Sequence, residues 1–130
     1  MNARWMALGA GLGCLGVALG AFGSHLARPH LSEQAYATYQ LGTFYHLIHA
    51  LALCLAAGFA KPGSRPFGLA CGLFAAGILF FSGALYVLSL GGLRSMGAVA
   101  PLGGLAFLAG WISLAVGAVQ VGRSNESKPA

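Results

Sequence analysis

Four stretches of the sequence contain no charged side chain, and their length constrains the fold more than any other feature. All Asp, Glu, Lys and Arg residues of the 130-residue chain lie outside residues 5–27, 34–60, 66–93 and 95–122. Each stretch exceeds the roughly 20 residues that a helix needs to cross a bilayer. A soluble amphipathic helix would show a charged face within such a window. The sequence therefore predicts four membrane-spanning segments.

The spans and their short connections use the whole chain, so we expect a single transmembrane domain over residues 1–130. Only 7% of the residues are charged, whereas soluble proteins carry about a quarter. The alternating pattern of barrel strands is absent, so the backbone must satisfy its polar groups in helices. We predict an all-α, integral membrane four-transmembrane-helix bundle, with helices over residues 5–23, 32–60, 67–90 and 99–121.

Short polar segments are expected to end these helices. Ser32 has the side chain of an N-cap for the second helix, and Glu33 would follow in its positive first turn. Pro29 stops the first helix from extending into the second. Residues 61–66 read Lys-Pro-Gly-Ser-Arg-Pro, which predicts a turn. Gly91 and its glycine neighbour end the third helix.

The distribution of basic residues predicts the orientation in the membrane. Lys and Arg are enriched on the cytoplasmic side of membrane proteins. One side of the predicted bundle carries five of them and the other carries Arg28 and Arg94, which places both termini in the cytoplasm. The five are Arg4, Lys61, Arg65, Arg123 and Lys128. The formal charge of +5 is thus an orientation signal, and its dispersal gives no support to nucleic-acid binding. The expected surroundings are the lipid bilayer.

Every predicted helix carries a stripe of residues at alternating spacings of three and four, and small residues are frequent in these stripes. Such spacing keeps one seam facing a partner helix, and small side chains let backbones approach closely. We therefore expect a bundle packed tightly on glycine and small-residue seams. The stripes are Gly9, Gly13, Gly16, Gly20, Gly23; Tyr39, Gly42, His46, His49, Leu53, Ala56; Gly68, Gly72, Ala75, Leu79, Ser82, Tyr86, Ser89; and Gly103, Ala106, Gly110, Ser113, Gly117.

Two histidines near the middle of the second predicted helix are the candidate functional residues. His46 and His49 lie three positions apart, which puts both imidazoles on one helix face. Ser82 and Tyr86 reach the outer half of the bundle from the third helix, and His25 lies where the first helix leaves the membrane on that side. We expect one polar pocket that narrows inward from the outer face.

Three interpretations of the histidine pair stay open. Neutral histidines can hold helices together by hydrogen bonds, they can line a ligand or cofactor pocket, or they can bind a metal. A metal site would require His25 to join His46 and His49, with no carboxylate or thiolate placed to help. Haem ligation is disfavoured because the two histidines share one helix face. The sequence assigns no cofactor.

Several activities lack the residues that they need. The predicted spans contain no Asp, Glu, Lys or Arg for a carboxylate-based proton relay. Neither an acid-containing catalytic triad nor a phosphate-binding glycine loop can be assembled. Cys14, Cys54 and Cys71 fall inside spans without paired spacing, so we expect them to behave as small apolar side chains.

Four motifs in order carry a family resemblance. They are residues 20–25 (GAFGSH), Tyr39-Gln40 with residues 49–53 (HALAL), residues 81–86 (FSGALY) and residues 101–111 (PLGGLAFLAGW). The chain resembles the small membrane proteins known as domain of unknown function 423, relatives of transmembrane protein 256. The resemblance implies a multi-pass protein of the cell inner membrane, without an established activity. It places His25, Gln40, His49, Ser82 and Tyr86 on motif positions, whereas His46 lies outside the motif.

Three functions compete at this point. The first is a non-enzymatic accessory or assembly component that packs against other subunits, as a homo-oligomer or within a larger membrane complex. The second is a protein that binds a quinone-like molecule, a lipid headgroup or a metal. The third is a small permeation protein, if the chain oligomerises around a wet path. The candidate ligand-binding residues are His25, Tyr39, Gln40, His46, His49, Ser82 and Tyr86.

Overall fold

A computed structural model describes residues 1–60 and 64–126 of the chain, and within them every long element is helical. Residues 61–63 of the expected turn and the basic residue Lys128 lie outside this range. The elements are α1 (Ala3–Phe22), the π-helix η1 (Gly23–Ala27), the 3₁₀ turn η2 (Arg28–His30), α2 (Glu33–Phe59), α3 (Arg65–Gly77), the π-helix η3 (Ile78–Ser82), α4 (Gly83–Gly91), the 3₁₀ turn η4 (Arg94–Ala98) and α5 (Ala100–Glu126).

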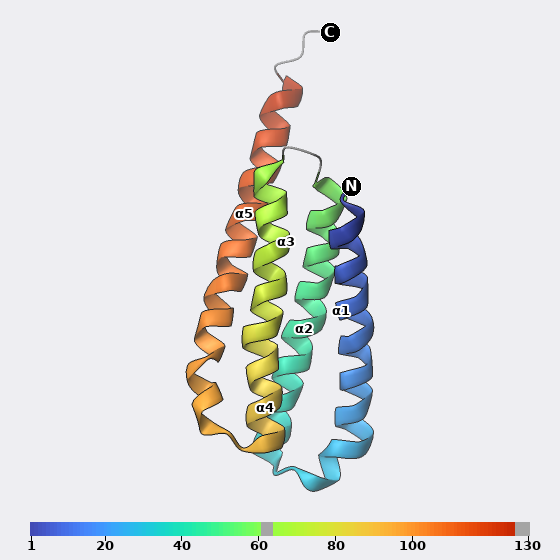
Figure 1. Ribbon diagram of the computed structural model, residues 1–130, viewed down its shortest axis with the longest axis vertical. Helices are drawn as coiled ribbons and strands as arrows, with labels where there is room; N and C mark the ends of the chain where they lie inside the picture. The colour runs from blue at the N-terminus through green and yellow to red at the C-terminus, as the bar shows by residue number, and fades with distance from the viewer. Residues whose placement is uncertain (61–63, 127–130) are drawn as a thin grey trace.

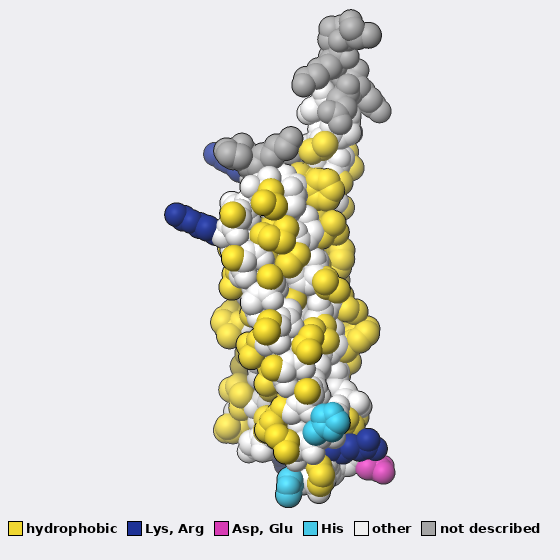
Figure 2. Space-filling view, turned by 90° about the vertical axis from the view of Figure 1, so that its right-hand side faces the viewer, with side chains coloured by type: hydrophobic (Ala, Val, Ile, Leu, Met, Phe, Trp, Pro, Cys, Tyr) yellow, Lys and Arg dark blue, Asp and Glu magenta, His cyan; other side chains and the backbone are white. Residues whose placement is uncertain are grey.

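These elements join into four helical segments long and apolar enough to span a membrane, as the charge-free stretches predict. They cover Ala3–His30, Glu33–Phe59, Arg65–Gly91 and Arg94–Ser124. Their axes run side by side, with the N-terminus and the C-terminal part of α5 at the same end (Figure 1). Hydrophobic side chains cover the middle of the visible face, while basic, acidic and histidine side chains lie near its ends (Figure 2). This is the four-transmembrane-helix bundle that the sequence predicts.

The ends of the helices follow local chemistry. The Ser32 hydroxyl accepts a hydrogen bond from the Ala35 amide at 3.2 Å, so it caps α2 as expected. After α4 the chain turns at Gly92, whose φ of +66° is the left-handed conformation that favours glycine. The first and last helices are longer than the ranges expected from sequence, because α1 continues through η1 and α5 continues to Glu126.

The outer helix α1 packs on α2 through glycines spaced by seven residues. At these positions an added Cβ would collide with side chains of α2, so only glycine allows the helices to lie this close. Gly13 is on the same predicted seam, but a Cβ added there would meet no atom of a neighbouring helix within 4 Å. A Cβ added at Gly9 would lie 2.6 Å from Cys54 Sγ, one at Gly16 would lie 2.7 Å from Leu47 Cδ2, and one at Gly23 would collide with the Tyr39 ring.

The outer helix α5 packs on α3 and η3 in the same manner. Its glycines, again seven residues apart, receive phenylalanines that are also seven residues apart on the antiparallel neighbour. Gly77 of α3 receives the Phe107 ring in return. An added Cβ would lie 2.7 Å from Phe74 Cε1 at Gly110 and 2.9 Å from Phe67 Cζ at Gly117, whereas at Gly103 it would collide with the backbone and Cβ of Phe81.

The predicted seam of the third helix is wrong in its first half. A Cβ added at Gly68 would meet nothing within 4 Å, and Leu79 is 67% exposed. The buried line is instead Phe67, Ala70, Cys71, Phe74 and Ile78. One reason is that α5 supplies the glycines at this interface, while α3 supplies the bulky side chains that pack against them. A second reason is that the wider turn of η3 rotates the helix, so that Ser82 at its end and Ser89 beyond it are buried.

Candidate functional site

His49 is held by hydrogen bonds on both ring nitrogens. Its Nδ1–H donates to the Tyr45 carbonyl at 2.8 Å. Its Nε2 accepts a hydrogen bond from the Trp111 indole N–H at 3.2 Å. The ring also lies parallel to Phe107, with centroids 3.5 Å apart and planes at 13°. A carbonyl can only accept and an indole can only donate, so the imidazole is neutral with its proton on Nδ1.

This arrangement makes His49 a link between α2 and α5. The lone pair that a metal would need is already directed at Trp111. Within the described residues, no group of three His, Cys, Asp or Glu side chains comes together. In particular, the candidate metal ligands His25, His46 and His49 do not form one cluster.

His46 begins a hydrogen-bonded chain that joins α2 to α4. Its Nδ1 lies 3.3 Å from the Tyr86 hydroxyl. That hydroxyl donates to Thr43 Oγ1 at 3.4 Å, and the Thr43 hydroxyl donates to the Tyr39 carbonyl at 3.2 Å. Each hydroxyl has one proton, so the Tyr86 oxygen must accept from Nδ1–H when all three bonds form.

Two buried polar atoms next to this chain have no hydrogen-bond partner among the described residues. They are Nε2 of His46 and Oγ of Ser82. His46 is only 2% exposed and Ser82 is fully buried. An unpaired buried acceptor or donor is unfavourable, which singles out this part of the bundle as a candidate for binding.

Tyr39 and Ser82 lie beside the same chain, but their contacts differ. The Tyr39 hydroxyl donates to the Leu19 carbonyl at 2.7 Å, which ties α2 to the end of α1. Its ring lies 5.0 Å from that of Tyr86. Ser82 precedes Tyr86 by one turn, and its carbonyl oxygen would lie 3.5 Å from a Cβ at Gly42.

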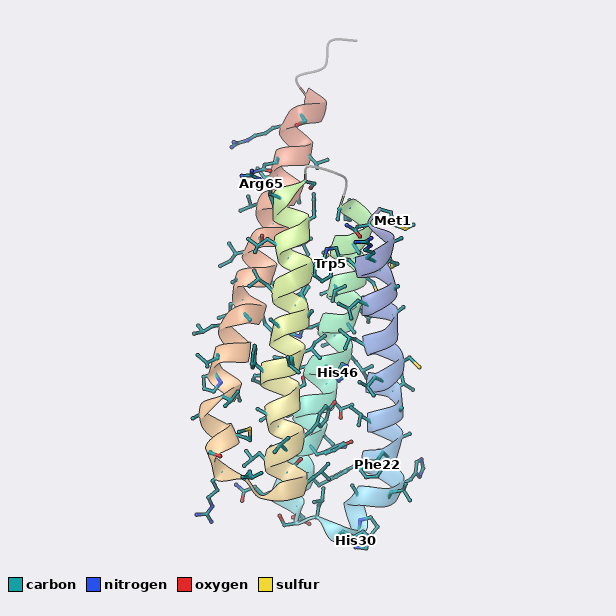
Figure 3. All side chains as sticks on the ribbon, viewed as in Figure 1. Met1, Trp5, Phe22, His30, His46 and Arg65 are labelled. Carbon is teal, nitrogen blue, oxygen red and sulfur yellow. The ribbon has the colours of Figure 1, made fainter. Side chains whose placement is uncertain are left out.

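His25 and Gln40 are separate from the buried histidines. His25 is exposed on η1. Gln40 is also exposed, and its amide donates to the Tyr36 hydroxyl at 3.1 Å, beneath the guanidinium of Arg28. Figure 3 shows His46 well inside the bundle, whereas His30 lies at its end. The candidate residues therefore do not form the expected single pocket. His46, Tyr86, Tyr39 and Ser82 lie near one another, His49 has separate contacts, and His25 and Gln40 are each exposed at the surface.

Two grooves open beside the histidines. The first, which we call the aromatic groove, has a volume of about 480 Å³ and lies between α2 and α5. Its lining residues are Phe44, Tyr45, Ile48, His49, Phe81, Gly104, Phe107, Leu108 and Trp111. The second, which we call the histidine groove, has a volume of about 170 Å³ and lies between α1 and α3–α4. It is lined by Leu12, Leu15, Leu19, His46, Ala75, Ile78, Leu79, Gly83 and Tyr86.

Sequence reasoning missed Thr43, Tyr45 and Trp111. Thr43 could have been found, because it lies on the same helix face as Tyr39 and His46. Trp111 could not be paired with His49 from the sequence, since that pairing depends on which face of α5 approaches α2. Tyr45 contributes its carbonyl and its ring, and no local pattern marks that role.

Comparisons with known proteins agree with this architecture. The family model "Protein of unknown function (DUF423)" matches residues 19–104. The UPF0382 inner membrane protein YgdD of Escherichia coli is 37% identical over 129 residues, which cover 98% of each chain. The UPF0382 membrane protein YwdK of Bacillus subtilis is 39% identical over 87% of this chain and 94% of its own. No solved structure matches the chain. The protein with two buried histidines and two glycine seams thus belongs to the DUF423 family of membrane proteins.

Proposed function

We propose that the protein binds a lipid-soluble molecule with a planar ring, such as a quinone, in the aromatic groove. The observation that carries this proposal is the composition of the groove: Phe, Tyr and Trp supply five of its nine lining residues, and His49 supplies a further flat ring. Aromatic walls favour a flat conjugated ring over an alkyl chain, because offset stacking adds about 0.5–1.5 kcal/mol per pair to burial.

The walls of the groove are fixed before a ligand arrives. The Trp111–His49 hydrogen bond and the His49–Phe107 stack hold three of the rings together. Tyr45 packs on Phe81, with ring centroids 4.7 Å apart. A preformed site loses little conformational entropy on binding.

The groove is accessible from the hydrocarbon. Phe44 is 58% and Leu108 62% exposed, and both line it. The lining residues of α2 lie near the middle of that helix, so a ligand has to be soluble in lipid to reach them. The Tyr45 hydroxyl makes no hydrogen bond with the described residues, which leaves one polar group for a ring oxygen.

Tryptophan fluorescence tests this proposal. The chain has two tryptophans, so Trp5→Phe leaves Trp111, a wall of the groove, as the reporter. A short-chain ubiquinone added to this variant in nanodiscs is expected to quench the emission with saturation. Gly104→Leu fills the groove and should raise the quinone concentration at half-saturation at least about tenfold. Gly11→Leu is the matched control, because a Cβ added at Gly11 would meet nothing within 4 Å.

Two results would count against ring binding. One is quenching that rises linearly with quinone in the membrane, which is collision without a site. The other is the same saturation curve for Gly104→Leu and Gly11→Leu.

We also infer that both termini face the cytoplasm. The support is the five-to-two distribution of Lys and Arg between the two ends of the bundle. Single cysteines at Ser95 and Ser124, in a variant without native cysteines, provide the test. A membrane-impermeant maleimide added to intact cells should label the cysteine at Ser95 and leave that at Ser124 unlabelled, and the reverse pattern would refute the orientation.

An accessory role within a membrane complex or homo-oligomer is the second candidate. The observation that favours it is the outer face of α1, where small exposed side chains recur at spacings of three and four. They are Ala7, Gly11, Cys14, Ala18 and Ala21. Native mass spectrometry of the protein from its own membrane separates the candidates. Stoichiometric foreign polypeptides would support the accessory role, and a reproducible small-molecule mass would support the binding role.

A further inference from the structure

A second polar feature of the bundle faces a different groove from the one proposed for ring binding. His46 and Tyr86 are the polar side chains among the nine residues of the histidine groove. The remaining lining residues are Leu, Ile, Ala and Gly. An apolar groove with one convergent polar group is the usual form of a small-molecule site.

The hydrogen-bonded chain through Tyr86 decides which His46 nitrogen carries the proton. Thr43 uses its single hydroxyl proton on the Tyr39 carbonyl, and Tyr86 uses its own on Thr43. Nδ1 of His46 must therefore donate to Tyr86. His46 is 2% exposed, and a buried charge without a counter-ion is unfavourable, so the imidazole is neutral. Nε2 therefore has a lone pair and acts only as an acceptor.

The environment of Nε2 offers no donor within the described residues. The edge of the ring that carries Nε2 faces α1, where Gly16 allows close approach: a Cβ there would lie 3.3 Å from His46 Cδ2. The Leu12 carbonyl is on this side of the imidazole as a possible acceptor, but Nε2 forms no hydrogen bond with it. A carbonyl is an acceptor too, so it cannot satisfy the lone pair of Nε2. The group that completes this site has to bring an O–H or N–H of its own.

The histidine groove opens to lipid and is narrow. Leu15 is 50% and Leu79 67% exposed, and both lie at its rim. A volume of about 170 Å³ holds the equivalent of about five or six water molecules, at about 30 Å³ each in the liquid. Only the end of a lipid molecule fits, while its remainder stays in the bilayer.

We propose that His46 Nε2 and the histidine groove bind the hydroxyl end of a long-chain, lipid-soluble alcohol. The hydroxyl donates to Nε2, and the first carbons of the chain lie against the leucines of α1. This site is independent of the aromatic groove, because His46 faces α1 and α4 while His49 faces α5.

Photoaffinity labelling with a matched pair of probes tests the proposal. One probe is a diazirine-bearing hexadecanol, and the other is its methyl ether, which has the same chain without the donor. In nanodiscs, the alcohol is expected to label the α1 segment around Leu12–Leu19 with saturation and at least about tenfold more strongly than the ether. His46→Phe, which removes the acceptor, should reduce alcohol labelling to the level of the ether.

Variants that fill one groove or the other separate this site from the proposed ring site. Gly83→Leu fills the histidine groove; a Cβ there has only the Ile78 carbonyl oxygen nearby, at 4.0 Å, so the helix can accept it. It should abolish the difference between alcohol and ether even if His46→Phe fails to fold. Gly104→Leu should leave that difference intact. Equal labelling by both probes in the wild-type protein would overturn the proposal.

The tautomer of His46 provides a second, direct test. Nitrogen-15 NMR of histidine-labelled protein should show Nδ1 protonated and Nε2 unprotonated in the resting protein, with the Nε2 signal shifting when hexadecanol is added. A protonated Nε2, donating to the Leu12 carbonyl, would mean that the site is complete without a ligand and would overturn the proposal. A shift produced equally by the methyl ether would do the same.

Discussion

The indole N–H of Trp111 donates a hydrogen bond to Nε2 of His49, 3.2 Å away, across the interface between α2 and α5. Lipid provides no hydrophobic driving force for helices to associate, so an interhelical hydrogen bond contributes directly to holding the helices together. This contact therefore fixes both the tautomer of His49 and the rotation of α5 relative to α2.

Replacing Trp111 with Phe should destabilise the bundle. The substitution keeps an aromatic ring but leaves Nε2 of His49 without its donor, at a cost of about 1–2 kcal/mol. Steric-trapping or SDS-unfolding measurements give the free energy of unfolding. Trp5→Phe is the control, since no side-chain hydrogen bond involves the indole of Trp5 among the described residues. Equal effects of the two substitutions would contradict this role.

The glycine seams predict opposite outcomes for identical substitutions. Gly110→Ala places a Cβ 2.7 Å from the Phe74 ring, which is fully buried, and overpacking of this kind costs about 1–3 kcal/mol. Gly13→Ala meets nothing within 4 Å and should leave the free energy of unfolding unchanged or raise it slightly. Adding Phe74→Leu to Gly110→Ala should recover part of the loss, whereas a purely additive double variant would exclude the steric explanation.

Two buried serines should respond differently to removal of the hydroxyl. The Ser113 hydroxyl donates to the Pro66 carbonyl at 3.0 Å, which ties α5 to the start of α3. Ser113→Ala is therefore expected to cost about 0.5–1.5 kcal/mol. Ser82→Ala removes a hydroxyl that has no partner among the described residues and should be neutral or stabilising. A loss at Ser82 as large as that at Ser113 would indicate that its hydroxyl is hydrogen-bonded in the membrane.

The turn after α4 depends on one glycine. At Gly92, with φ of +66°, any L side chain is strained, so Gly92→Ala should cost about 1 kcal/mol. Gly97→Ala, in η4, is the comparison, because Gly97 has no positive φ and a Cβ added there would meet nothing within 4 Å. Thermal unfolding in one detergent would detect the difference, and equal melting temperatures would show that the turn relaxes.

The spans could be predicted from the sequence because charge is costly in hydrocarbon at every position, so its absence over 20 or more residues is a strong signal. The seams of α1 and α5 were predictable in outline for a similar reason, since close helix packing needs small residues. The seam of α3 was not, because its glycines at positions 68 and 72 indicate one face, whereas the face that packs is the one that supplies phenylalanines to the glycines of α5. The π-turn η3 also changes the phase of the helix without a local signal.

The candidate site was predictable only within single helices. The shared helix face of Tyr39, Thr43 and His46 on α2 follows from their spacing of four and three residues. The separation of His46 from His49 does not: their side chains bond to different helices, His46 to Tyr86 of α4 and His49 to Trp111 of α5. That outcome depends on which helices flank α2, a property of the whole fold.

The sevenfold spacing of the glycines on α5 has a consequence for how the helices find their alignment. Sliding α5 along α3 by one seven-residue repeat, about 10.5 Å, would place Gly103 opposite Phe74 and Gly110 opposite Phe67. Two of the three glycines would then again face a phenylalanine. Side-chain fit alone thus distinguishes the two alignments weakly. A slip in one direction would draw Arg94 into the hydrocarbon, and a slip in the other would draw in Arg123, at a cost of about 2.5–3.5 kcal/mol for each guanidinium that reaches the centre. The thickness of the bilayer therefore selects the alignment, and a detergent micelle, which has no fixed thickness, would select it less strictly.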